Sequence, residues 1–329
     1  MELLFRAVHE AEPGPKWAAL FAEHWPAYRR WWAREGLAAR PTYSECRHAL
    51  AAHMPEIGAL YDGLAELAGG GDAEARFLSF YCPPPYLSGC SQAIWPGAAP
   101  MLVRNYDYDP RAFDALVLAT AWQGRRVIGV SDGCWGLVDG MNDAGLAVSL
   151  TFGGRRVIGE GFGVPLILRY ILQTCNTSGE AVQALTRIPC HMSYNVTVVD
   201  AARRYATVFL APDRTAQVTQ APASTNHQGR VEWSSHARFT ATVERERFLL
   251  NRLTLHREPA ETFIAAFLRP PLYSVAFSQG FGTLYTAVYR PLQGAMALHW
   301  PDSVWSLPLN GFEDAARLVR VPEAAPSPG

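Results

Sequence analysis

Several features that place proteins at membranes or on nucleic acid are missing from this 329-residue sequence. No apolar run reaches the length of a membrane span, and the first residues lack the charged and apolar pattern of a signal peptide. The charges nearly cancel, with 29 Lys and Arg against 30 Asp and Glu, and no basic stripe alternates with aromatic residues. We therefore expect a cytoplasmic protein without a membrane or nucleic-acid partner.

Cysteine is also scarce. The six cysteines stand at positions 46, 82, 90, 134, 175 and 190, and no two of them form a C-x-x-C pair. Their spacing, like that of the histidines, fits neither a zinc ligand set nor a disulfide framework. We expect no metal and no cofactor.

The first 89 residues predict a mainly helical region. Aromatic and aliphatic residues recur at helical spacing over 16–35, and a glycine follows. A second helix is predicted to start at Thr42 and to stop at Gly69, the first of three glycines. A short strand over 75–81 then leads into a run of prolines.

Beyond residue 90 the pattern changes to strands. They are predicted over 115–122, 126–130, 146–152, 195–200, 205–210, 217–220, 283–290 and 295–299. Helical patterns over 162–187 and 239–268 interrupt them. This order of elements predicts an α+β fold with packed antiparallel sheets and helices outside. The last seven residues, 323–329, are expected to be a disordered tail.

The remaining elements are organised around Cys90, which follows Gly89. Three prolines at 83–85 precede this pair and cannot be helical, and two strands around the Pro96-Gly97 turn follow it. Cys90 is therefore expected at the entrance of a β-hairpin, after a residue without a side chain. A thiol at such a position can attack the peptide bond before it. The alternative is that Cys90 is a small buried hydrophobe, as most cysteines are.

A first polar cluster is Arg104-Asn105-Tyr106-Asp107. Strand alternation puts Arg104 and Tyr106 on one face and Asn105 and Asp107 on the other. A bend near Asp107 would bring Arg104 and Asp107 together around a neighbouring thiol, whose pKa an arginine lowers. The alternative is an ion pair at the end of a surface strand.

Three more polar segments follow, and the second and third have two interpretations each. Residues 139–146 predict a turn that enters a strand. Asn195 begins a strand, where its amide either donates to an oxyanion or caps the strand. The sequence Thr-Asn-His at 225–227 contains His227, which is either a general base for the thiol or a structural histidine.

These elements occur in one order along the chain: Gly89-Cys90, R-N-x-D at 104–107, G-M-N-x-x-G-L at 140–146, Asn195 before Val-Thr-Val-Val-Asp, Thr-Asn-His at 225–227, and an Arg-rich helix near Arg245. The ordered set resembles the isopenicillin-N acyltransferase-like group (acyl-coenzyme A:6-aminopenicillanic acid acyltransferases) of autoproteolytic N-terminal nucleophile hydrolases. It is similar, more distantly, to choloylglycine and penicillin V hydrolases. The resemblance covers essentially the whole chain.

The resemblance implies a four-layer αββα sandwich and a chain that cuts itself between Gly89 and Cys90. Residues 1–89 would remain as a helical small subunit, and residues 90–322 would form the catalytic large subunit. The two fragments would then be each other's partners. A free N-terminal amine has a pKa of about 7.7–8.0, so the new amino group of Cys90 can serve as the base for its own thiol.

The resemblance also assigns roles. Cys90 is the nucleophile, Asp107 and Arg104 position its amine and thiol, and Asn195 supplies the oxyanion donor. Secondary candidates are Thr151, which stands where choloylglycine-type members carry Asn, Arg245, for which Arg247 competes, Asn226 and His227.

The implied function is an amide hydrolase or acyltransferase that acts on a small acyl amide or peptide. A thioester on Cys90 would pass its acyl group to water or to an amine, and the outcome depends on whether the pocket excludes water. The alternative from another class is a catalytically inactive binding module of the same fold, in which the Gly89–Cys90 bond stays intact.

Overall fold

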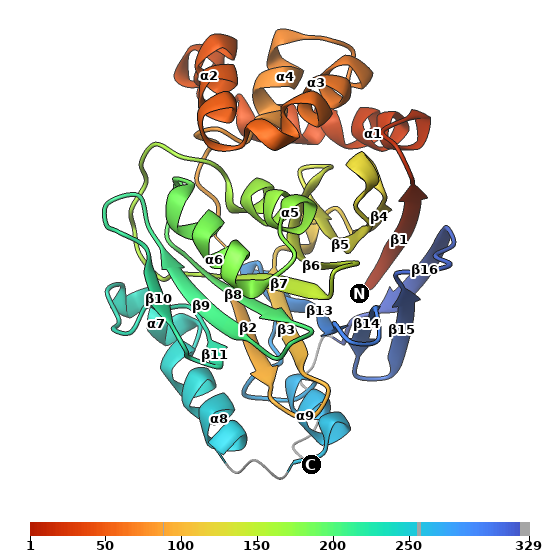
Figure 1. Ribbon diagram of the computed structural model, residues 1–329. Coiled ribbons are helices and arrows are strands. Elements are labelled where there is room, and N and C mark those ends of the chain that lie inside the picture. The colour runs from red at the N-terminus through yellow and green to blue at the C-terminus, as the bar shows by residue number, and fades with distance from the viewer. Residues whose placement is uncertain (88, 255–257, 323–329) are drawn as a thin grey trace.

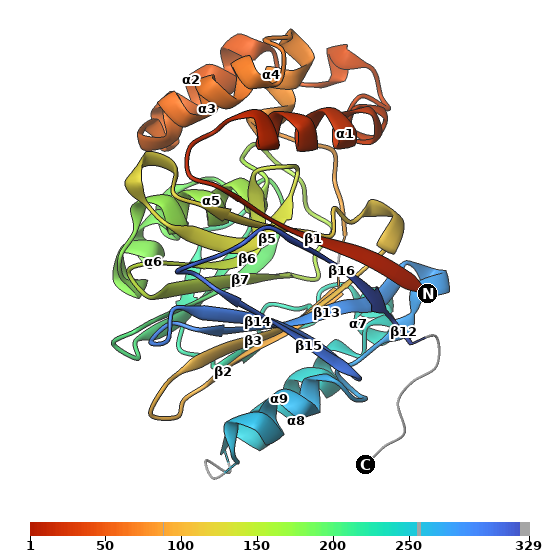
Figure 2. The same cartoon turned by 90° about the vertical axis from the view of Figure 1, so that its right-hand side faces the viewer.

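The computed structural model describes residues 1–87, 89–254 and 258–322, and their strands form two sheets that lie face to face (Figure 2). The larger sheet has the order β10 (Gln217–Thr219), β9 (Tyr205–Leu210), β8 (Tyr194–Asp200), β7 (Leu146–Phe152), β6 (Gly136–Asn142), β5 (Val127–Asp132), β4 (Leu116–Thr120), β1 (Glu2–Glu10) and β16 (Ala315–Arg320). The smaller has the order β11 (Ala223–Ser224), β2 (Gly89–Trp95), β3 (Met101–Tyr108), β13 (Phe281–Arg290), β14 (Ala295–Trp300) and β15 (Ser303–Pro308), with β12 (Val275–Ala276) beside β13.

Helices cover the outer face of each sheet (Figures 1 and 2). α5 (Val164–Thr174) and α6 (Ser178–Arg187) pack on the larger sheet, whereas α8 (Thr242–Thr254) and α9 (Ala260–Phe267) pack on the smaller one, with the short α7 (Ser234–Phe239) before α8. The layers therefore run α, β, β, α, and the predicted α+β sandwich is confirmed.

A further group of helices lies outside α5 (Figure 1). It consists of α1 (Pro15–Trp32), α2 (Tyr43–His53), α3 (Gly58–Leu67) and α4 (Asp72–Leu78). Short 3-10 turns are η1 (Leu37–Ala39), η2 (Pro55–Ile57), η3 (Pro110–Ala112), η4 (Trp122–Gly124) and η5 (Phe277–Gln279). The predicted helical N-terminal part is thus present.

The interior between the sheets is partly polar. β7 and β8 are buried along their whole length, because one face of each meets helices and the other meets the smaller sheet. Ser149 of β7 donates to the amide oxygen of Gln92 on β2 across the gap, at 2.5 Å. This polar layer is where the candidate site lies.

Two predictions for the N-terminal part are wrong in detail. The expected strand over 75–81 is largely the helix α4, and the single helix from Thr42 is interrupted at Pro55, which has no N–H to continue it. Its predicted start is correct, since the Thr42 hydroxyl and the Glu45 carboxylate form a capping box.

Six strands were not predicted from the sequence: β1, β6, β11, β12, β15 and β16. β1 pairs in parallel with β4 and antiparallel with β16, so the two ends of the described chain meet in one sheet. β15 and β16 are largely exposed and lack a clear apolar alternation. The turn expected over 139–146 is shorter than predicted, because its first four residues belong to β6. The predicted tail, 323–329, lies outside the described residues.

Candidate active site

Cys90 lies in β2 directly opposite Tyr106 of β3, and Gly89 lies opposite Asp107. The cysteine is fully buried, at 0% exposure, in this continuous chain. A side chain at position 89 would collide with the ring of Phe281, so glycine is the residue that fits there. The Gly89–Cys90 peptide bond therefore lies at the start of β2, between two buried residues.

The thiol faces the gap between the sheets, where it meets Arg104. One guanidinium nitrogen of Arg104 lies 3.2 Å from Cys90 Sγ, and its Nε donates to the Leu150 carbonyl at 2.9 Å. The guanidinium also pairs with the buried carboxylate of Asp139, which accepts a further hydrogen bond from the Tyr285 hydroxyl at 2.7 Å. Asp139 thus holds the cation that contacts the sulfur.

Burial and the Arg104 charge shift the pKa of the Cys90 thiol in opposite directions. Burial raises the pKa of Cys90, and the nearby Asp107 carboxylate adds to this. The Arg104 charge and its hydrogen bond lower the pKa but do not outweigh burial. In the uncut chain the thiol is therefore protonated at neutral pH.

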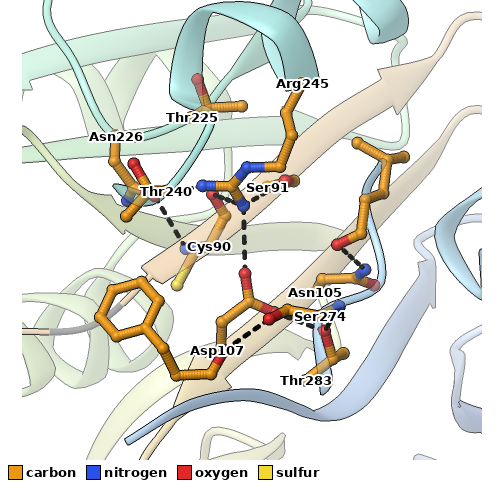
Figure 3. Close-up of polar contacts among 12 residues, drawn as sticks. Cys90, Ser91, Asn105, Asp107, Thr225, Asn226, Thr240, Arg245, Ser274 and Thr283 are labelled. Carbon is orange, nitrogen blue, oxygen red and sulfur yellow. Dashed lines mark hydrogen bonds and ion pairs between the residues drawn. The ribbon is translucent and has the colours of Figure 1, made fainter. Parts of the chain in front are cut away.

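Arg245 and Asp107 form an ion pair on the side of β3 opposite to Arg104 (Figure 3). A guanidinium nitrogen of Arg245 lies 3.0 Å from Asp107 Oδ2 and 3.1 Å from the carbonyl oxygen of Cys90, to which it donates. It also donates to the Ser91 hydroxyl at 2.9 Å, while the Thr283 hydroxyl donates to Asp107 Oδ1 at 2.7 Å. Arg247 is not buried, so Arg245 is the arginine that reaches the site.

This ion pair is almost completely removed from solvent. Burial raises the pKa of Asp107, opposed by the Arg245 charge and the Thr283 hydrogen bond, and burial lowers the pKa of Arg245, opposed by Asp107. Two buried charges remain favourable only when hydrogen bonds satisfy them, as the contacts with Ser91, Thr283 and the Cys90 backbone do here.

Asn226 is the amide that contacts Cys90. Its Oδ1 accepts the Cys90 N–H at 3.2 Å and a guanidinium proton of Arg245 at 2.7 Å (Figure 3). Its Nδ2 donates to the Phe152 carbonyl at 3.2 Å, and its own N–H donates to the Thr242 hydroxyl at 2.6 Å. The nitrogen that would become the N-terminal amine thus already has an oriented acceptor.

Asn195, in contrast, holds the segment that carries Asn226. Its Nδ2 lies 2.8 Å from the Thr225 carbonyl, 3.0 Å from the His227 carbonyl and 3.1 Å from the Thr151 hydroxyl oxygen. An amide nitrogen has two protons, so these three acceptors leave none for a substrate. Thr151 likewise donates to the Thr225 carbonyl, at 2.7 Å.

Both ring nitrogens of His227 have partners other than the thiol. Its Nε2 lies 3.1 Å from the Glu246 carboxylate and its Nδ1 lies 3.0 Å from the Thr242 hydroxyl. These contacts favour the structural interpretation of this histidine.

The sequence-predicted residues therefore fall into two groups around one strand. Arg104 and Asp107 lie on opposite faces, as alternation predicts, and each has its own ionic partner. They do not pair with each other, but both act on the pKa of the Cys90 thiol. Sequence reasoning missed Asp139, because an acidic residue beside Gly140 looked like part of a turn. The apolar residues around it, Leu137, Val138 and Met141, were the available signal in the sequence.

A family model for acyl-coenzyme A:6-aminopenicillanic acid acyl-transferase matches residues 96–305, more than half of the chain. The chain belongs to this family. The family membership confirms the resemblance found in the sequence and supports acyl transfer or amide hydrolysis as the kind of activity. The matched range begins after Cys90, so the role of that residue depends on the geometry above.

Solved structures are also similar to the chain, three of which are named here. They are a mutant of conjugated bile acid hydrolase from Clostridium perfringens (13% identity, 73% of this chain, 99% of that chain, TM-score 0.44), penicillin V acylase from Agrobacterium tumefaciens (15%, 70%, 90%, 0.45) and the Caenorhabditis elegans ortholog of N-acylethanolamine-hydrolyzing acid amidase (16%, 67%, 100%, 0.44). No curated protein sequence matches the chain.

Two further findings concern the described ranges. Within residues 1–87, 89–254 and 258–322, no helix is both long and apolar enough to cross a membrane. The same ranges hold no group of three or more His, Cys, Asp or Glu side chains arranged for a metal ion.

Proposed function

We propose that this protein is a self-processing cysteine amide hydrolase or acyltransferase, with Cys90 as its N-terminal nucleophile. One observation carries the proposal: Arg104 contacts the sulfur of Cys90, whereas Asn226 and Arg245 contact the backbone nitrogen and carbonyl oxygen of the same residue. Three buried polar groups directed at one cysteine exceed what a structural thiol needs.

The first reaction is cleavage of the chain's own Gly89–Cys90 bond. The thiol sulfur attacks the carbonyl carbon of Gly89, the carbon–nitrogen bond breaks, and the nitrogen of Cys90 takes the thiol proton. Water then hydrolyses the thioester, which leaves a carboxylate on Gly89 and restores the thiol. Two fragments result, residues 1–89 and a large fragment that starts at Cys90.

The freed amine then serves as base. Its unperturbed pKa of about 7.7–8.0 lets it accept the thiol proton near neutral pH. Asn226 Oδ1 accepts a hydrogen bond from this nitrogen in the uncut chain and keeps it oriented afterwards. Asp107 contributes through Arg245, which it holds against Asn226 and the Cys90 carbonyl.

Turnover of an external amide follows the same chemistry. The thiolate attacks the substrate carbonyl, the ammonium of Cys90 protonates the leaving amine, and a thioester remains on the sulfur. Water or a second amine then takes the acyl group, and the thiolate is restored. The substrate is a small acyl amide or peptide; the cytoplasmic location and the absence of a cofactor stay predictions.

Two side-chain amides, those of Asn195 and Asn226, are candidates for the oxyanion donor. Asn195 was expected from the sequence, and its role there stays a prediction. The geometry favours Asn226, because Asn195 has three acceptors for two protons while Asn226 adjoins the reacting residue. We propose that Asn226 touches the reacting group and that Asn195 positions the segment around it.

Denaturing electrophoresis of freshly purified protein tests the proposal. Wild-type protein should give two bands and Cys90→Ala a single band. Cys82→Ala is the matched control, because this cysteine precedes the proline run and should leave cleavage unchanged. A Cys90→Ala protein that is still cut at this bond makes the processing external. An uncut, inactive wild-type chain would support the binding module instead.

A further inference from the structure

A cavity of about 230 Å³ lies between the helical N-terminal layer and the larger sheet. α1 contributes Tyr28 and Trp31 to its wall, and the segment before Cys90 contributes Tyr86. Phe77, Phe80, Tyr108 and Phe113 add four more aromatic rings to the wall. Such a wall suits an apolar frame, and the faces of its rings also attract cations.

Two carboxylates, Asp114 and Asp132, interrupt this aromatic wall. The Tyr28 hydroxyl lies 2.7 Å from Asp114 Oδ1 and 3.0 Å from Asp132 Oδ1, and it accepts the Gly133 N–H at 2.8 Å. Because the hydroxyl has a single proton, it can donate to only one carboxylate at a time. The two carboxylates, Asp114 and Asp132, therefore have fewer hydrogen-bond donors than they can accept.

Asp114 provides a second and independent sign of a missing partner. Its side chain is 5% exposed, and its Oδ2 is buried without a donor at hydrogen-bond distance among the described residues. Native proteins rarely leave a buried carboxylate oxygen unsatisfied. The peptide N–H groups of Gly133 and Cys134 lie near enough to lower the pKa of this carboxyl, but burial raises it to about 6.

The other charged groups nearby do not fill this gap. His24 lies with its Nδ1 3.7 Å from Asp114 Oδ1, but its Nε2 accepts from the Arg6 guanidinium at 3.0 Å, so the ring is neutral, and burial lowers its pKa further. Arg111 lines the cavity with an 86% exposed side chain that is paired to Asp109 at 2.7 Å. Arg104 is near enough to lower the pKa of Asp132 but is itself paired to Asp139.

The cavity lies on the thiol's side of β3. The Tyr108 ring stands 5.5 Å from the Tyr106 ring, and the Arg104 guanidinium lies over Tyr106 at 4.5 Å. The same guanidinium contacts the sulfur of Cys90. Tyr108, which lines the cavity, and Arg104, which contacts the thiol, are thus linked through Tyr106 along one face of β3.

We propose that the cavity binds a protonated amine, so that the enzyme acts on amides that carry an ammonium group on an apolar frame. The ammonium would donate to Asp114 Oδ2 and Asp132, and the frame would pack on the aromatic wall. An ammonium brings three donors and one positive charge, which is what this pair lacks. The inference rests on the proposed function, and it gives the helical layer a part in substrate selection.

Binding to the full-length Cys90→Ala chain tests the inference without turnover. The probes are phenethylamine, its neutral counterpart 2-phenylethanol and the anion 3-phenylpropanoate, measured by calorimetry and by tryptophan fluorescence at pH 8. We expect phenethylamine to bind at least tenfold more tightly than either of the other two. Equal binding of amine and alcohol, tighter binding of the anion, or no binding of any probe overturns the inference.

Charge-removing variants locate the effect. Asp114→Asn and Asp132→Asn should each reduce the preference for the amine to less than threefold. Asp143→Asn, whose partners are Arg125 and Arg126, is the matched control and should keep the preference. An undiminished preference in both cavity variants would show that the amine binds elsewhere. Failure of the proposed function would appear separately, as an uncut wild-type chain, and would leave these binding results readable.

Discussion

Arg245 donates a hydrogen bond to the carbonyl oxygen of Cys90, across 155 positions of sequence, at 3.1 Å. The same side chain pairs with Asp107 and donates to Asn226. One buried guanidinium of α8 therefore contacts the backbone of the reacting residue and two of its neighbours. Cleavage, turnover and stability should all respond when this arrangement is altered.

Replacement of Arg245 should abolish cleavage and weaken the fold. Arg245→Ala leaves the buried Asp107 carboxylate without its partner, which typically costs about 3–5 kcal/mol of unfolding free energy. Denaturant unfolding and the fraction of cut chain after purification measure both effects. Arg247→Ala, two positions away and outside the site, is the control and should match wild type in both. Normal cleavage in Arg245→Ala would remove this residue from the site.

The two amides should differ in how they affect turnover. Loss of an oxyanion donor costs about 2.7–4 kcal/mol in the transition state, or roughly 100- to 1000-fold in rate. Asn226→Ala should show this loss in the rate of cleavage. Asn195→Ala should lower the rate less and should speed the amide hydrogen exchange of residues 225–227, because its hydrogen bonds hold that segment. The reverse order of rates would return the donor role to Asn195.

Cys90 should become reactive only after processing. It is fully buried in the continuous chain, where burial raises the pKa of its thiol. In the cut protein its own ammonium and Arg104 favour the thiolate. Limiting iodoacetamide should therefore modify Cys90 first, in proportion to lost turnover.

Asn226→Ala protein, treated while its slowed cleavage leaves the chain uncut, is the control for this experiment, and its Cys90 should stay unmodified. Burial also raises the pKa values of the other five thiols, at 46, 82, 134, 175 and 190. Peptide mapping that finds another cysteine alkylated first, with turnover intact, would remove the chemical support for Cys90.

The carboxylates of the cavity should impose a pH dependence on stability. Burial and the neighbouring Asp114 charge raise the pKa of Asp132 to about 7. As the pH falls, a carboxyl with a raised pKa binds its proton at a higher pH in the folded state than in the unfolded state. Its contribution to stability is full below pH about 4 and is lost as the pH rises through about 7.

Asp132→Asn should therefore raise the free energy of unfolding at pH 8 relative to wild type, on the order of 1–3 kcal/mol, since one pKa unit corresponds to about 1.4 kcal/mol. The gain should shrink toward pH 4. Asp213→Asn is a control of opposite sign, because its hydrogen bonds with Arg155 lower the pKa of Asp213. A gain in Asp132→Asn that is the same at both pH values would contradict the assignment of a raised pKa.

Strong local patterns were sufficient for much of the fold. β7 and β9 have the predicted bounds, and the Thr42 cap starts α2 as expected. Predictions failed where distant pairing decides the structure. β1 is a strand because β4 and β16 flank it, and neither neighbour is evident from residues 2–10 alone.

In the candidate site, too, local sequence patterns revealed some residues, whereas contacts between distant segments were not predicted. The order of motifs was enough to bring out Cys90, Arg104 and Asp107 as candidates. The order of motifs also brought out Arg245 as a secondary candidate, but not its pairing with Asp107, and it missed Asp139. Both partners reach the strand from other layers of the sandwich, 35 positions from Arg104 and 138 positions from Asp107. Only the packed sheets bring these residues together.

Intact-mass measurement of the purified wild-type protein in denaturant tests the central claim most directly. We expect two masses, which correspond to residues 1–89 with a free carboxylate and to a large fragment beginning with an unblocked Cys90. The two masses should sum to the full chain plus one water. A single mass for the continuous chain in catalytically active protein, or a cut at another bond, would contradict an N-terminal nucleophile at Cys90.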